Sequence, residues 1–146
     1  MAQSSVLTVT INENILLNGN YRNTGVEYAV NNVVGIENKI VNIPTGSFTE
    51  LLKFSGSLAG ASAGTLVYES LAYLRITNLE VTGSAFVKLI GAVSSSYLIE
   101  LDPQQSFMIN NTHISGSNEQ IASLRVLTGP SATGSINMEY YLATTQ

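Results

Sequence analysis

The stretch Leu71-Ala72-Tyr73-Leu74-Arg75-Ile76-Thr77, with Ala85-Phe86-Val87-Lys88-Leu89-Ile90 after it, decides the fold. Both segments are rich in the aliphatic, aromatic and β-branched residues that strands prefer, and both alternate with a period of two. Between them lies Val81-Thr82-Gly83-Ser84, a cluster typical of a turn. The two segments are therefore predicted to be consecutive strands, with Leu74 and Ile76 of the first facing inward.

The same pattern of short apolar runs between turn-forming clusters continues in both directions. It predicts an all-β chain with about nine strands, folded as a single-domain two-sheet antiparallel sandwich over residues 1–146, jelly-roll-like in outline. Besides Leu71 to Thr77 and Ala85 to Ile90, the expected strands are Val6 to Ile11, Val26 to Val30, Lys39 to Ile43, Tyr97 to Leu101, Ser106 to Asn110, Ala122 to Leu127 and Ile136 to Leu142.

Three other segments have a less regular pattern. Ser47-Phe48-Thr49-Glu50 matches a capping box for a short helix ending near Gly56, but the alternation of Phe48, Leu52 and Phe54 favours a strand. Residues 57–65 are nearly all small and predict a loop. Residues 1–5 are short and uncharged, and we expect either a flexible N-terminal arm or a frayed end.

Charge is scarce in this sequence. Six basic and ten acidic residues in 146 make 11% charged residues and a net charge of −4, whereas most globular domains carry about a quarter. The basic residues are scattered singly, which disfavours nucleic-acid binding. No apolar run approaches a membrane span and the first residues do not resemble a secretory signal, so we expect synthesis in the cytoplasm and no membrane partner.

Several predicted strands are apolar on both faces, which a monomeric sandwich with one hydrated face does not require. Phe86 and Ile90 point away from the inward set of their strand, beside Lys88, and Tyr141 does the same in the last strand. We therefore predict a homo-oligomer whose interface, with itself or a partner protein, includes Phe86, Lys88, Ile90 and Tyr141. The alternative is that Phe86 and Ile90 lie under a loop of the same chain.

Residues that could carry chemistry are few. His113 is the only His and Asp102 the only Asp, and no Gly-x-Ser-x-Gly turn presents a serine to them. Glu100 and Asp102 could share one face of a strand, but no further anionic ligand is near in sequence. No phosphate-binding motif and no Cys occur. The sequence predicts no catalytic, metal or cofactor site and a protein that is not an enzyme. Sugar binding by stacking stays open through the tyrosines, among them Tyr21, Tyr97, Tyr140 and Tyr141.

About half of the chain resembles small β-sandwich virion proteins of tailed bacteriophages. The similar segments are Tyr73 to Glu80, Ala85 to Leu89, Tyr97 to Asn110 and Ile136 to Leu142, which look like a Leu-Arg-Ile-Thr-Asn-Leu strand, a Val-rich strand, a strand that begins Leu-x-Pro-Gly-x-Ser-Phe, and a closing strand. One departure is that Gln104 or Gln105 stands where a turn glycine is usual after Pro103.

The resemblance implies a structural protein of the virion, made in the host cytoplasm. The role it favours is a capsid decoration or cement protein, a homotrimer that clamps the major capsid protein or another virion protein and needs no cofactor. The alternative is a glycan- or receptor-binding module of a phage tail or fibre.

Overall fold

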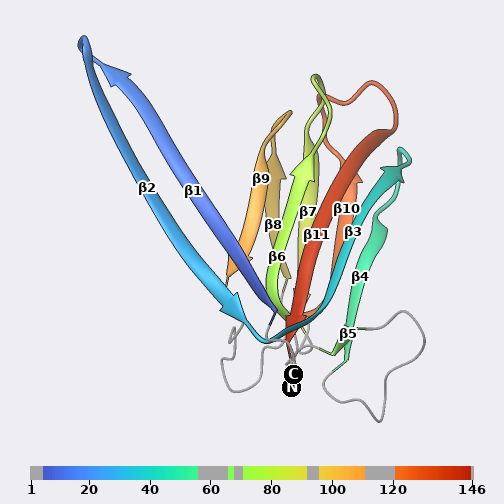
Figure 1. Ribbon diagram of the computed structural model, residues 1–146. Helices are drawn as coiled ribbons and strands as arrows, with labels where there is room; N and C mark the ends of the chain where they lie inside the picture. Colours follow the sequence, from blue (N-terminus) through green and yellow to red (C-terminus); the bar gives the residue numbers. More distant parts are fainter. Residues whose placement is uncertain (1–4, 56–65, 68–70, 92–95, 111–120, 146) are drawn as a thin grey trace.

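The computed structural model describes residues 5–55, 66–67, 71–91, 96–110 and 121–145, and in these ranges the chain is built from strands without a helix (Figure 1). This confirms the predicted all-β fold with two antiparallel sheets. Residues 1–4 and the predicted loop at 57–65 lie outside the described residues. The strands are β1 (Val6–Leu17), β2 (Asn20–Asn31), β3 (Val33–Ile43), β4 (Thr49–Ser55), β5 (Leu66–Val67), β6 (Leu71–Asn78), β7 (Ala85–Gly91), β8 (Ser96–Leu101), β9 (Ser106–Asn110), β10 (Ile121–Thr128) and β11 (Ile136–Thr145).

Two sheets form the body of the molecule, in the orders β3-β11-β6-β9 and β5-β4-β10-β7-β8. Apart from the parallel pair of β4 with the short β5, all pairs are antiparallel. The pairs β3–β11, β4–β10, β6–β9 and β7–β8 are nested one inside the next, as in a long hairpin rolled up on itself. This is the strand pairing of a jelly roll.

The core lies between the inner faces of the two sheets. One sheet contributes Ile43, Leu74, Ile76, Met138 and Leu142, and the other contributes Val87, Leu124 and Val126, all less than 2% exposed or close to it. Because side chains alternate along a strand, each of these strands presents a second set outward. The ambiguous segment forms a strand, β4, whose buried Leu52 lies opposite Leu124 of β10.

One buried polar side chain connects the turn after β6 to the end of β8. Asn78 is fully buried, and its amide nitrogen donates to the carbonyls of Gly83 at 2.9 Å and Leu101 at 3.2 Å. Its amide oxygen accepts from the Glu80 N–H at 3.1 Å. The resemblance expects glycine at position 104 or 105, and in the neighbouring turn Gln104 lies in the left-handed region with φ 62°.

A hairpin of β1 and β2 projects from the jelly roll and pairs with neither sheet (Figure 1). Its register runs unbroken from Val6 opposite Asn31 to Leu17 opposite Asn20. The turn is Asn18-Gly19, both with positive φ (51° and 76°), as a tight two-residue turn of this twist requires. Of the predicted arm at residues 1–5 only Ser5 is described, and it pairs with Val33 at the base of this hairpin.

Candidate functional site

The projecting hairpin has one largely apolar face and one face that is polar except for Val6 at the root and Leu16 and Tyr21 at the tip. On the apolar side, Leu7, Val9 and Ile11 lie opposite Val30, Tyr28 and Val26, and Ile15 and Leu17 continue this side to the tip. On the other side, Thr8, Thr10, Asn12 and Asn14 alternate with them along β1. The name arm face is used below for Leu7, Val9, Ile11, Ile15, Leu17, Val26, Tyr28 and Val30.

The root of the arm face packs on the outer face of the β3-β11-β6-β9 sheet. Leu7, Val9, Tyr28 and Val30 contact a small cluster formed by the buried Val33, Tyr73 and Ala143 with Tyr141. The rings of Tyr28 and Tyr73 lie 6.5 Å apart, and Tyr141 meets Tyr73 edge-on at 6.1 Å. Burial raises the pKa of both Tyr28 and Tyr73 above 10.0. The arm is therefore anchored through aromatic packing that is partly shielded from water.

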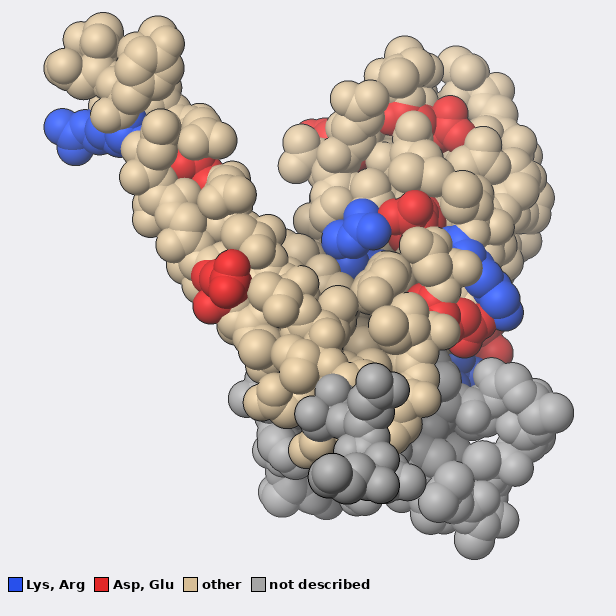
Figure 2. Space-filling model, viewed as in Figure 1, with Lys and Arg blue, Asp and Glu red and all other residues tan. Residues whose placement is uncertain are grey.

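Beyond the root, the arm face has no partner among the described residues. Val26 is 59% exposed, Ile15 52% and Leu17 49%. Figure 2 shows the hairpin standing apart from the sandwich, with few charged side chains along it. A two-stranded hairpin is at best marginally stable in water on its own, so an arm of this length needs something to cover its apolar face.

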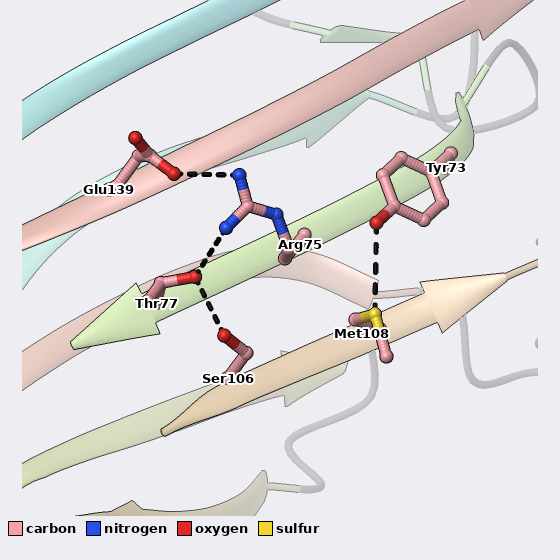
Figure 3. A network of polar contacts seen from close by, with 6 residues as sticks. All are labelled: Tyr73, Arg75, Thr77, Ser106, Met108 and Glu139. Carbon is pink, nitrogen blue, oxygen red and sulfur yellow. Dashed lines mark hydrogen bonds and ion pairs between the residues drawn. The ribbon is translucent and has the colours of Figure 1, made fainter. Parts of the chain in front are cut away.

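The outer face of the β3-β11-β6-β9 sheet has a polar network at its centre (Figure 3). The Arg75 guanidinium binds the Glu139 carboxylate at 2.7 Å and donates to the Thr77 hydroxyl at 2.8 Å, and that hydroxyl lies 2.8 Å from the hydroxyl of Ser106. The Tyr73 hydroxyl points at the Met108 sulfur, 3.7 Å away. Because each charge is paired, this part of the face is close to neutral.

Beside this network, the edge strand β3 presents exposed apolar side chains. Val34, Ile36 and Ile40 are 61%, 58% and 63% exposed, and they are called the β3 rim below. Ile36 lies opposite Ala143 and Ile40 opposite Glu139, which places these two residues on the outer face, next to the cluster that holds the arm root, whereas Val34 lies at the bulge where β3 begins.

The inward side of β3 carries a charged pair. Lys39 binds Glu37 at 2.5 Å, and the hydroxyl of the buried Tyr140 donates to the same carboxylate at 2.8 Å. The bond from Lys39, with that from Tyr140, lowers the pKa of Glu37 below 4.5. Burial, with the neighbouring Glu37, raises the pKa of Tyr140 above 10.0.

The predicted interface residues fall on two different sheets. Phe86, Lys88 and Ile90 lie together on the outer face of β7, each half-buried, and the Lys88 ammonium sits 5.3 Å from the centre of the Phe48 ring. Tyr141 belongs to the outer face of the opposite sheet, beside Tyr73. The structure therefore brings three of the four residues together and separates the fourth from them by the core.

The arm and the β3 rim were not predicted from the sequence. The signal for the arm was Asn18-Gly19, flanked on both sides by alternating apolar residues, which is a strong indicator of a hairpin. The rim had a weaker signal, since Val34, Ile36 and Ile40 differ from core residues only in being on the other side of their strand.

The residues considered for chemistry do not form a site in the described part of the chain. His113 lies outside it. Glu100 and Asp102 are exposed at the end of β8. Within the described ranges, no three His, Cys, Asp or Glu side chains gather closely enough to hold a metal ion.

No protein-family model matches the sequence, and no curated protein is significantly similar to it. The described ranges also hold no helix of the length and apolarity needed to cross a membrane.

Proposed function

We propose that this protein is a non-enzymatic structural component of a virus particle, of the capsid decoration or cement type. It associates with copies of itself, as a trimer around a symmetry axis, and binds a major capsid protein or another virion protein. Its role is mechanical, since each copy adds contacts that must break together before the particle opens.

The observation that carries this proposal is the projecting arm. An amphipathic hairpin with Ile15, Leu17 and Val26 about half exposed is costly for a protein that stays alone in water, because large exposed apolar surfaces favour association. The β3 rim adds a second exposed apolar surface on the same molecule. Both apolar surfaces would be buried if the protein were part of an assembly.

Two further observations support the proposal. The jelly roll recurs in viral capsid proteins, although the fold is also found in lectins and enzymes and does not determine function. The strand motifs from Tyr73 to Asn110 resemble those of phage virion proteins, and they form β6 to β9 of the jelly roll.

The test has two parts. Analytical ultracentrifugation of the purified protein over a wide concentration range should give a defined oligomer, with a trimer expected. An antibody against the protein should label intact particles of the virus that encodes it in electron micrographs. A strictly monomeric protein that also fails to bind those particles would overturn the proposal.

A glycan-binding module of a tail or fibre is the second candidate, and exposed tyrosine rings favour it. Tyr21 at the arm tip and Tyr97 on β8 are 77% and 63% exposed, and such rings can stack on sugars. A glycan array probed with the oligomer tests this role. Binding that is lost in Tyr21→Ala or Tyr97→Ala would favour it over the first candidate, and a blank array would remove it.

A further inference from the structure

We propose that the distal arm face of one copy seats on the β3 rim of a neighbouring copy, so that the subunits are linked by exchanged arms. This inference deepens the proposed function and rests on its self-association. The contact joins Ile15, Leu17 and Val26 of one chain to Val34, Ile36 and Ile40 of the next.

The proposed contact would continue one that the arm already makes within its own chain. The root of the arm face packs on Tyr73, Tyr141 and Ala143 of its own outer sheet face. The apolar side chains on the same side of the hairpin continue past the last intramolecular contact as Ile11, Val26, Ile15 and Leu17, with Glu13, Thr24, Arg22 and Asn20 interspersed among them. The rim likewise extends this cluster on the sheet side, because Ile36 lies opposite Ala143.

The direction of the arm relative to its own β3 rim favours a contact between different copies. Figure 1 shows the hairpin leaving the sandwich at its base and diverging from the sheet, on the side away from β3. The tip of an arm in this position cannot reach the rim of its own chain. A neighbour's arm can approach that rim without moving any strand of the jelly roll.

The β3 rim and the distal arm face are also similar in chemistry. The rim offers three aliphatic side chains next to a charge-paired network. The distal arm face offers three aliphatic side chains, and Glu13 and Arg22 lie beside them on the same side of the hairpin. Both surfaces are nearly neutral and apolar. Two such surfaces on one chain, each uncovered, are complementary in the way that a head-to-tail contact between identical subunits requires.

The size of the contact suggests a closed assembly. The seven residue pairs from Ile11–Val26 to the tip span roughly 24 Å, and two strands are about 10 Å wide. Seating one arm therefore hides about 500 Å² in total, well below the roughly 1,600 Å² of a standard stable interface. In a ring every subunit gives one arm and accepts one, which doubles the area for each copy and fits the expected trimer.

The absence of Cys from the sequence makes cross-linking a direct test. Two differently tagged variants, Ile15→Cys and Ile40→Cys, are co-expressed, purified as a mixed oligomer and treated with a short bismaleimide. The expected product is a covalent dimer that carries both tags. As a matched control, Asn14→Cys replaces Ile15→Cys, which moves the thiol by one residue along β1 to the opposite face of the arm. The yield of mixed dimer should then fall at least fivefold.

A pair of substitutions tests the same contact without a cross-linker. Leu17→Ser and Leu16→Ser change the same residue type at neighbouring positions of the tip, 49% and 57% exposed, on opposite faces of the hairpin. Leu17→Ser should raise the concentration for half-dissociation at least tenfold, and Leu16→Ser should change it less than threefold. Circular dichroism of both variants checks that the jelly roll is intact.

The outcomes separate this inference from the proposed function. A stable oligomer that gives no mixed cross-link, or that is weakened equally by both serine variants, overturns the exchanged arm and leaves self-association standing. Efficient cross-linking of Ile15→Cys with itself would also overturn it, because it places two tips together. A monomer at all concentrations defeats the proposed self-association itself.

Discussion

Replacing Asn78 by leucine should destabilise the protein strongly although the side chain keeps its number of heavy atoms and its branching at Cγ. Asn78 is fully buried, and its amide makes three hydrogen bonds of 3.2 Å or less, to the carbonyls of Gly83 and Leu101 and the N–H of Glu80, besides a longer one of 3.4 Å to the Asp102 carbonyl. Leucine fills the space but leaves all three backbone groups without this partner. The substitution therefore isolates the polar contribution from the cost of a cavity.

The expected magnitude follows from those three bonds. A hydrogen bond contributes about 1 kcal/mol net, and a buried group left unpaired costs about 1–3 kcal/mol. Allowing for partial recovery by water at the turn, the loss is about 3 kcal/mol, or a fall in Tm of roughly 10 °C for a chain of this size. This is a large share of the stability of a typical domain.

The assay is urea unfolding followed by circular dichroism, at one fixed protein concentration because association shifts apparent stability. The control is Asn42→Leu, since Asn42 is exposed and its amide bonds only the side chains of Ser135 and Asn137. The control should change stability by less than about 0.5 kcal/mol. If Asn78→Leu is equally mild, the buried amide is not what fastens the turn to β8, and the reasoning fails.

Three further predictions concern a glycine, a titrating pair and the effect of salt. Gly129→Ala should cost several kcal/mol of stability, because its Cβ would lie 2.8 Å from the backbone C and O of Ser84, whereas Gly134→Ala has open space and should be nearly neutral in the same unfolding assay. Tyr140→Phe removes a hydrogen bond that lowers the pKa of Glu37. Because a lowered carboxyl pKa contributes stability above pH 4.5 that is lost on acidification, the difference in unfolding free energy between wild type and variant should shrink from pH 6 to pH 3. A difference that stays constant over this range would contradict the prediction. Self-association should change little between 50 mM and 500 mM NaCl in sedimentation experiments, because apolar contact dominates and few charges are screened; dissociation by salt would refute an apolar interface.

The jelly roll was largely predictable because its strands have strong local patterns. β6 and β7 alternate cleanly, and their inward residues Leu74, Ile76 and Val87 are buried as the period requires. β4 was ambiguous because a capping box competes with alternation there. Pairing with β10, which buries Leu52 opposite Leu124, decides in favour of the strand, and no local pattern contains that information.

The extent of the first three strands was underestimated for a different reason. Asn12, Glu13 and Asn14 in β1, and Glu37 and Asn38 in β3, are poor strand formers by propensity. They are held in strands by long antiparallel pairing, with β2 in one case and with β11 in the other. Propensity alone therefore ends these strands too early.

The sequence predicted that an apolar surface is covered by a partner, but not which residues form it. Apolar residues on both faces of a strand indicated that a second face is covered, but alternation does not say which sheet a strand joins. Tyr141 was grouped with Phe86 for this reason, although their strands lie in different sheets. The arm could have been identified from Asn18-Gly19, whereas its divergence from the sandwich depends on packing at its root.

The position of β11 has a consequence for how the chain is made. The last strand, Ile136–Thr145, lies between β3 and β6 and supplies Met138 and Leu142 to the core, so its sheet cannot close until the ribosome has released these residues. The β1–β2 hairpin has only local pairing and can form within microseconds of emerging. A chain stopped before Ile136 would thus carry a hairpin that lacks Tyr141 and Ala143, on which its root packs, and an open sheet with β3 separated from β6. A chain that ends before this strand therefore cannot complete the β3-β11-β6-β9 sheet or close the jelly roll.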